Sequence, residues 1–277
     1  RISRKELAYI EGRLRSSGTS ERQQPDTIPW RDIVRSLPVY AIVVCDMGNS
    51  WGLTLFLTQL PTYMKNVLGF SIKANGALSA LPFLSRYTGA VGASTLSDWL
   101  VQHHHLSLIN TRRIFSILAM WVPAVVVIGV AYGGCQWEVT VALICLALFF
   151  NGAITTSVIV NSTDIAPNLS GTLFGISNTF ASIISFIVPV VTGLITNHQE
   201  TLAQWRKVFW VCVPMYTLTE IFYLIFVSSN VQPWNFRDQS LTTGDDAQET
   251  SLTTVKHQSY NVDTRNQETL VNSLATK

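Results

Sequence analysis

The sequence has few charged residues and lacks the motifs of common soluble enzymes. Only 13% of its 277 residues are Asp, Glu, Lys or Arg, whereas soluble domains carry about 25%. The net charge of +2 is too small to indicate nucleic-acid binding. The sequence has no HExxH motif, no glycine-rich phosphate loop and no Ser/His/Asp order in a suitable context. We therefore expect no enzyme and no cofactor.

The cysteines and histidines do not form a metal-binding or disulfide pattern. The four cysteines are Cys45, Cys135, Cys145 and Cys212, and no two of them have CxxC spacing. This pattern indicates small buried apolar side chains rather than a disulfide framework or a zinc site. The three histidines at 103–105 are adjacent, so their side chains point in different directions and make a poor chelate. We predict no metal site.

Long hydrophobic runs dominate the chain instead. A membrane core about 30 Å thick requires about 20 mostly apolar residues in a helix. Six stretches meet this requirement: Leu37–Leu60, Asn75–Val101, Arg112–Tyr132, Glu138–Val160, Thr172–Thr196 and Val208–Ser228. The fold class that follows is an all-α membrane protein with six transmembrane helices.

The polar ends of the chain set its domain organisation and orientation. We expect a cytoplasmic loop over residues 1–36, a six-helix transmembrane bundle over 37–229 and a disordered cytoplasmic tail over 230–277. Eight Lys and Arg residues precede the first span, which places that segment in the cytoplasm. Six spans then return the C-terminus to the same side. Because the chain begins with Arg1 rather than Met, we expect a fragment or a processed chain.

Three ionisable residues lie deep in the predicted spans. At about 1.5 Å per residue, Asp46 lies about 11 Å, Arg86 about 14 Å and Glu220 about 10 Å from a span end. A charge at the centre of a bilayer costs at least about 2.5 kcal/mol, so each should meet a partner or water. Two interpretations of Arg86 stay open. Either it pairs with Asp46 and only joins two helices, or it presents positive charge to a cavity that attracts an anion.

Helical spacing indicates which faces of two spans are polar. One face of the second span carries Ser79, Pro82, Arg86, Gly89, Ala93 and Ser97, and the opposite face carries Leu84, Tyr87, Thr88 and Val91. We therefore expect Arg86 to point toward the bundle. One face of the fifth span carries Gly171, Gly175, Asn178, Ser182, Ser185, Pro189, Thr192 and Thr196. We interpret its two glycines as a helix-packing contact, and its polar residues as either packing or cavity lining.

Several segments resemble one transporter family. They are "IPWRDIVRSLPVYAIVV" (28–44), "LTQLPTYMKNVLGFSIKANGALSALPFL" (57–84), "NSTDIAPNLSGTLFGISNTFA" (161–181) and "VQPWN" (231–235). They are similar to the C-terminal half of the sialin, vesicular glutamate and type I sodium–phosphate cotransporter family. This family is the anion/cation symporter branch of the major facilitator superfamily.

The resemblance implies a twelve-helix transporter in which this chain is the C-terminal bundle and an N-terminal six-helix half is missing. Substrate would bind between the halves near the midplane. The first and fourth spans would line the cavity, the second and fifth would flank it, and the sixth would lie outermost, which argues against Glu220 as a site. The vesicular glutamate branch has arginine where this chain has Asn49, and many sialin-like members have histidine in place of Asp46. Arg86 is then a candidate replacement for the charge missing at Asn49.

These observations predict secondary active transport of a small inorganic or organic anion, coupled to sodium or protons. Arg86 would supply positive charge and Asp46 would bind the coupling ion. The expected hydrogen-bonding residues of the substrate site are Asn49, Ser50, Asn151, Thr155 and Asn178. The expected location is the plasma membrane or an endolysosomal or vesicular membrane. The alternative is a truncated membrane protein that binds or senses a ligand without transporting it.

Overall fold

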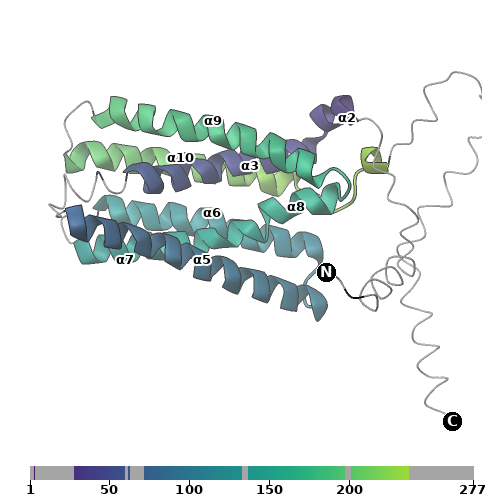
Figure 1. The fold of residues 1–277 in the computed structure, drawn as a ribbon, viewed down its shortest axis with the longest axis horizontal. Helices are drawn as coiled ribbons and strands as arrows, with labels where there is room; N and C mark the ends of the chain where they lie inside the picture. The colour runs from purple at the N-terminus through teal and green to yellow at the C-terminus, as the bar shows by residue number, and fades with distance from the viewer. Residues whose placement is uncertain are drawn as a thin grey trace, which may run out of the picture. The chain divides into compact units, whose positions relative to one another are not determined.

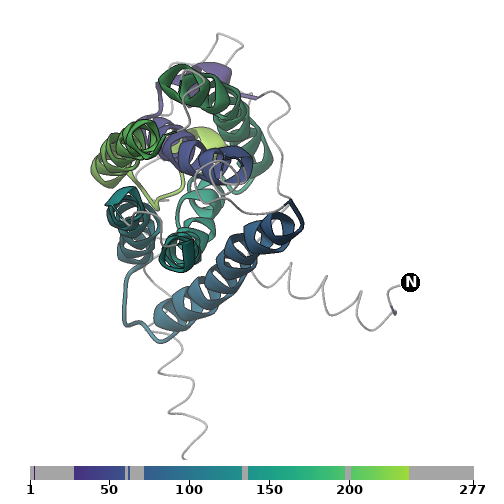
Figure 2. The same ribbon diagram turned by 90° about the vertical axis from the view of Figure 1, so that its left-hand side faces the viewer.

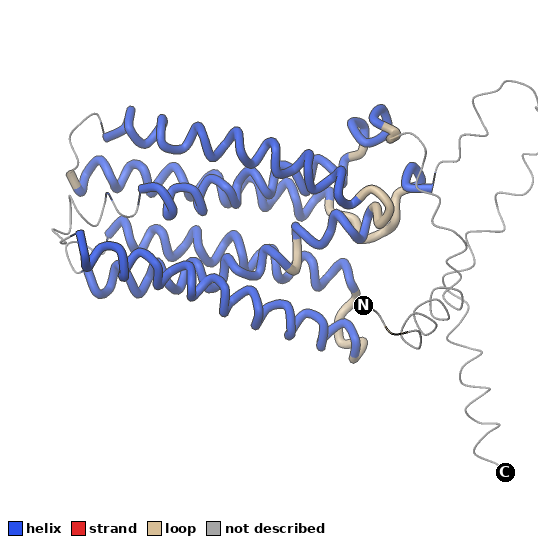
Figure 3. Tube along the Cα trace, in the orientation of Figure 1, coloured by secondary structure: helices blue, strands red, loops and turns tan. Residues whose placement is uncertain are grey.

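Helices make up nearly all of the chain that the structure describes. The computed structural model describes residues 3, 28–59, 62, 72–132, 137–196 and 201–236. Within these ranges there are helices, turns and short connections and no β-strand (Figure 3). The predicted tail from 237 onward and most of the predicted N-terminal loop lie outside the described residues.

The helices follow one another with short connections. They are α2 (Trp30–Arg35), α3 (Leu37–Thr54) continued by the π-helix η1 (Leu55–Gln59), α5 (Ile72–Gln102), α6 (Leu108–Tyr132), α7 (Trp137–Asn151), the 3-10 helix η2 (Gly152–Thr155), α8 (Val158–Ile165), α9 (Ser170–Thr196), α10 (Leu202–Phe226) and the 3-10 helix η3 (Pro233–Phe236). Two of them lie outside the predicted bundle: α2 falls in the segment expected to be a loop, and η3 falls in the segment expected to be a tail.

Five helical segments of the described chain are long and apolar enough to cross a membrane. They are Leu37–Gln59, Leu108–Tyr132, Glu138–Ile165, Ser170–Thr196 and Leu202–Phe226. The remaining predicted span corresponds to α5, which is 31 residues long but falls outside this set because it carries many small polar residues and Arg86. The last span begins at Leu202, six residues before the predicted Val208.

The long helices pack side by side as one bundle (Figure 1). Neighbours far apart in sequence include α5 with α7, α10 with both α3 and α6, and α3 with α9. The end view in Figure 2 shows α5 crossing the other helices obliquely at one edge. The end of α8 contacts the segment after α10. The backbone N–H of Gln232 donates a hydrogen bond to the carbonyl of Ile165, the last residue of α8, at 2.8 Å.

The burial pattern of α5 confirms the face predicted from its sequence. Pro82, Gly89 and Ser97 are buried, whereas the residues expected on the far side are exposed. These exposed residues are Leu84, Tyr87, Thr88 and Val91. The helical periodicity therefore fixes which side of α5 meets the bundle.

Glycines let the backbones of α5 and α7–η2 touch directly. A Cβ atom at Gly89 would collide with the carbonyl oxygen of Phe149, and one at Gly152 would lie 2.5 Å from the carbonyl oxygen of Arg86. Van der Waals packing between close backbones is a main source of helix association in membranes. The packing prediction for Gly171 and Gly175 is wrong within the described chain, because no atom lies within 4 Å of a Cβ built at either position.

This contact predicts a difference between two glycines of α5. Gly89→Ala should lower the free energy of unfolding by about 1–3 kcal/mol, because the added methyl group forces two backbones apart. Gly92→Ala is the matched control, since no atom lies within 4 Å of a Cβ at Gly92. Unfolding in mixed detergent micelles measures both. Equal stability of the two variants would contradict the close approach.

Candidate functional site

The span over Glu138–Ile165 is not one continuous α-helix. The α-helix α7 ends at Asn151, η2 follows as a 3-10 turn, and α8 begins at Val158. The hydroxyl groups of Thr156 and Ser157 donate to the Ala153 carbonyl oxygen, at 2.9 and 3.2 Å, and so satisfy part of the interrupted backbone. Breaks of this kind in membrane helices occur where the backbone is buried in protein or lines a cavity, and here Gly152, Ala153 and Ile154 are buried.

Asn151, the last residue of α7, links three helices. Its side chain is fully buried, at 0% exposure. Its Oδ1 atom accepts a hydrogen bond from Nε of Arg86 at 3.1 Å. Its Nδ2 atom donates to Oδ1 of Asn49 at 3.0 Å and to the Ala119 carbonyl at 3.3 Å. The structure thus brings together Arg86, Asn151 and Asn49, three of the residues predicted for the site.

Arg86 does not pair with Asp46. Among the residues that the structure describes, the one ion pair joins Arg112 to Asp164. Arg86 is partly buried, and its side chain donates a hydrogen bond to the neutral amide of Asn151. An arginine carries five N–H donors, and the hydrogen bond from Nε leaves the other four available. The structural interpretation, in which Arg86 only forms an ion pair with Asp46, is therefore wrong.

Asp46 lies at a separate place between α3, α8 and α9. Its Oδ2 atom accepts a 2.7 Å hydrogen bond from the hydroxyl of Ser177. Asp46, Ser162 and Ser177 also line a cavity of about 10 Å³ together with apolar side chains. This volume is close to the minimum needed for one water molecule. The Ser162 hydroxyl donates to the Ile159 carbonyl of its own helix at 2.7 Å, so the polar contact of Asp46 at this small cavity is with Ser177.

The other predicted residues do not join these two groups. Thr155 donates to the Gly152 carbonyl of its own turn at 2.9 Å, and Asn178 is exposed on α9. In the described chain no hydrogen bond links Ser50 to Arg86, Asn151 or Asp46. On α9 the Ser185 hydroxyl accepts a 2.8 Å hydrogen bond from Thr54, whereas Ser182 donates to the Asn178 carbonyl.

Arg112 and Asp164 form a pair that sequence reasoning did not find. Nε of Arg112 donates to Asp164 at 2.7 Å, and Nη2 donates to the other carboxylate oxygen at 3.2 Å. Nη1 of Arg112 donates to the carbonyl of Thr156, directly after η2. Arg112 therefore holds both ends of α8, and it satisfies a carbonyl that the broken helix leaves free. Asp164 lies in one of the segments that resemble the transporter family, and Arg112 begins a predicted span, but no sequence signal showed that the two residues meet.

Glu220 is buried in the contact of α10 with α3 and α6. Its side chain is 0% exposed. Its oxygens accept hydrogen bonds from the Ser116 hydroxyl at 2.7 Å and from the Cys45 thiol at 3.5 Å. A carboxyl group at this place meets polar neighbours and no cation among the described residues. It stands apart from both predicted groups.

Comparison with protein families identifies the class. A family model described as Major Facilitator Superfamily matches residues 10–189. This match, together with the helical fold, shows that the chain belongs to the major facilitator superfamily, as a multi-pass membrane protein. The superfamily consists of transporters and not enzymes, in agreement with the sequence prediction.

Individual relatives narrow the similarity. The chain is 35% identical to a putative inorganic phosphate cotransporter of Drosophila ananassae over 237 residues, which is 85% of this chain and 48% of that protein. It is 34% identical to human sialin over 86% of this chain and 47% of the relative. It is 32% identical to vesicular glutamate transporter 1 of Xenopus laevis over 84% of this chain and 40% of the relative. These matches confirm the predicted resemblance, and the chain spans about half the length of the relatives.

The buried ion pair yields a stability prediction. Asp164→Asn should lower the free energy of unfolding by about 3 kcal/mol, because it leaves the buried Arg112 without a compensating charge. Asp98→Asn, at an exposed position of α5, is the matched control and should change stability by less than about 0.5 kcal/mol. Chemical unfolding in detergent measures both. If the Asp164→Asn protein is as stable as the Asp98→Asn control, the ion pair does not stabilise the fold.

Proposed function

We propose that this chain is the C-terminal half of a twelve-helix secondary transporter of a small anion. The substrate class is inorganic phosphate or an organic carboxylate. Sodium or protons supply the driving gradient, and the two halves expose the site alternately to the two sides of the membrane. The protein resides in the plasma membrane or in a vesicular or endolysosomal membrane, with both ends of this chain in the cytoplasm.

The observation that carries the proposal is the state of Arg86. A guanidinium at membrane depth is held by the buried Asn151 and has no acidic partner in the described chain. Its remaining donors have the planar arrangement that binds phosphate or carboxylate oxygens in a bidentate manner. Because the partner of Arg86 is the neutral amide of Asn151 and not a carboxylate, the positive charge of Arg86 stays available for a substrate.

The link from Arg86 to Asn49 supports the same function. Arginine stands at the position of Asn49 in the vesicular glutamate branch, and here Asn49 receives a hydrogen bond from Asn151, which also binds Arg86. The positive charge therefore stands on α5 instead of α3 and is linked to Asn49 through the side chain of Asn151. A shifted charge favours an anion of different shape from glutamate. The resemblance to a putative inorganic phosphate cotransporter supports a phosphate-like substrate.

Asp46 is the proposed coupling residue. Its carboxylate, Ser162 and Ser177 surround a cavity of single-ion size. Hard cations such as sodium prefer oxygen ligands, and a carboxylate at membrane depth can also take up a proton. Because Asp46 lies on α3 with Asn49, one helical turn away, cation binding and substrate binding act on the same helix.

Loss of the Arg86 charge should strongly reduce transport. In the complete transporter, Arg86→Gln should reduce uptake of radiolabelled phosphate or sialic acid about tenfold or more, because a charged hydrogen bond to the anion is lost. Arg86→Lys keeps the charge but not the planar fork and should have an intermediate effect. Lys207→Gln, at an exposed position, is the control. Uptake that survives Arg86→Gln in correctly folded protein would reject this site.

Removal of the Asp46 charge should separate transport from its driving gradient. Asp46→Asn should abolish accumulation driven by a sodium or proton gradient and retain exchange of internal for external anion, because the anion site remains. Proteoliposomes with one imposed gradient at a time measure this and identify the coupling ion. Asp98→Asn is the exposed carboxylate control. Normal gradient-driven accumulation by Asp46→Asn would show that the coupling residue lies elsewhere.

A further inference from the structure

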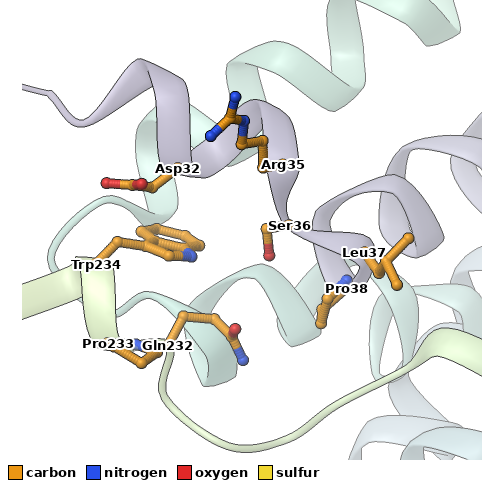
Figure 4. A pocket seen from close by; sticks show the side chains of 8 residues that line it. All are labelled: Asp32, Arg35, Ser36, Leu37, Pro38, Gln232, Pro233 and Trp234. Carbon is orange, nitrogen blue, oxygen red and sulfur yellow. The ribbon is translucent and has the colours of Figure 1, made fainter.

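A second pocket lies at the end of the bundle, away from the proposed transport site. It has a volume of about 620 Å³ and lies where α2 leads into α3 and where the chain leaves α10 (Figure 4). Its lining residues are Asp32, Arg35, Ser36, Leu37, Pro38, Gln232, Pro233 and Trp234. Arg86 and the other proposed transport residues do not line it.

Ser36 offers an unused hydroxyl group at this pocket. It is the N-cap residue of α3, and its side chain makes no capping hydrogen bond. An N-cap serine ordinarily accepts from the second or third backbone N–H of its helix, but here the second residue is Pro38, which has no N–H. Ser36 is only 9% exposed, and its Oγ atom has no hydrogen-bond partner in the described chain.

Trp234 offers a second unused donor. Its side chain is 8% exposed, and its indole nitrogen has no hydrogen-bond partner among the described residues. In Figure 4 this nitrogen lies on the edge of the indole nearer Ser36, and both it and the Ser36 hydroxyl oxygen are shielded from solvent. The next residue, Asn235, anchors this segment of the chain, because its Oδ1 atom accepts a 3.1 Å hydrogen bond from the backbone N–H of Asn168. Buried donors without partners are rare in folded proteins, because each costs about 1–3 kcal/mol.

The charges around the pocket favour an anion. Residues 36–38 lie at the N-terminus of α3, an 18-residue helix, where the helix dipole attracts negative charge, although Pro38 has no N–H and the N–H groups of Val39 and Tyr40 donate to the Ser36 carbonyl. Arg35 lies at the rim and is exposed. Asp32 also lies at the rim, is already engaged in another interaction, and points away from the gap between Ser36 and Trp234 (Figure 4).

We propose that this pocket binds a phosphate-type oxyanion, through the Ser36 hydroxyl, the Trp234 N–H group and the N-terminus of α3. The anion is either the headgroup of an anionic phospholipid or a free phosphate ion. The site lies about 20 Å along α3 from Asn49 at about 1.5 Å per residue. It is therefore distinct from the proposed transport site, and it extends the function beyond transport to ligand binding at the end of the bundle.

The test measures thermal unfolding of the full chain in dodecyl maltoside micelles, which contain no phosphate. Dioleoyl phosphatidic acid is titrated in one arm, with dioleoyl glycerol as its neutral counterpart, and inorganic phosphate is titrated in another. All arms also run in an Arg86→Gln background, so that phosphate bound at the proposed transport site does not contribute. A ligand that binds the folded state raises the unfolding temperature as its concentration rises.

The variants remove one donor each. Trp234→Phe deletes the N–H group and keeps the ring, and Ser36→Ala deletes the hydroxyl. Each should weaken binding about tenfold, as expected for loss of a hydrogen bond to a charged group. Trp210→Phe, at an exposed indole of α10, is the matched control and should bind like the parent.

The outcomes distinguish the sources. Stabilisation by phosphatidic acid alone identifies a lipid headgroup, and stabilisation by inorganic phosphate identifies a free anion. The proposal is overturned if neither ligand stabilises the parent protein, or if Trp234→Phe and Ser36→Ala bind as well as Trp210→Phe. Because the Arg86→Gln background is included, this result does not depend on whether Arg86 carries transport.

Discussion

A guanidinium inside a membrane bundle must find hydrogen-bond acceptors, and the way Arg86 finds one determines the rest of the site. Its acceptor is Asn151, at the point where α7 ends. The two residues meet because α5 and the α7–η2 segment touch backbone to backbone at Gly89 and Gly152. Larger residues at these glycines would move α5 away and would separate the charge from its acceptor.

Arg112, which is buried, and Arg86, which is partly buried, are held in opposite ways. Arg112 is paired with a carboxylate and with a backbone carbonyl, so its charge is compensated within the protein. Arg86 is bound by an amide and forms no ion pair in the described chain. A compensated charge stabilises a helix break, whereas an uncompensated charge in a medium of low dielectric attracts an anion strongly. The partner, more than the arginine itself, therefore indicates the function.

Hydropathy and periodicity predicted those features of the fold that depend on a single helix. The spans and the buried face of α5 follow from local spacing, and the structure confirms that face through Pro82, Gly89 and Ser97. Local spacing carries no information on how one helix is shifted along another. For this reason the sequence named Asn49 and Asn151 separately, and their hydrogen bond could not be predicted.

Features that depend on contacts between distant segments were missed for the same reason. Arg112 and Asp164 are 52 residues apart; the sequence placed Arg112 at the start of one predicted span and Asp164 beyond the end of the next. The close contact was assigned to Gly171 and Gly175, because a glycine pattern shows that a close approach is possible but not which helix makes it. The break at 152–155 was also missed, since its sequence is as apolar as the helix on either side.

The hydrogen bond from Arg86 to Asn151 also sets how an anion would bind. Asn151 donates to Asn49 and to the Ala119 carbonyl, so its amide is fixed from both sides. A guanidinium fixed through Nε has its two terminal nitrogens already oriented, and less side-chain entropy is lost when it binds. An anion can then bind both terminal nitrogens without breaking the hydrogen bond to Asn151. Under the proposed function, binding energy is then left for the helix movement that alternating access requires.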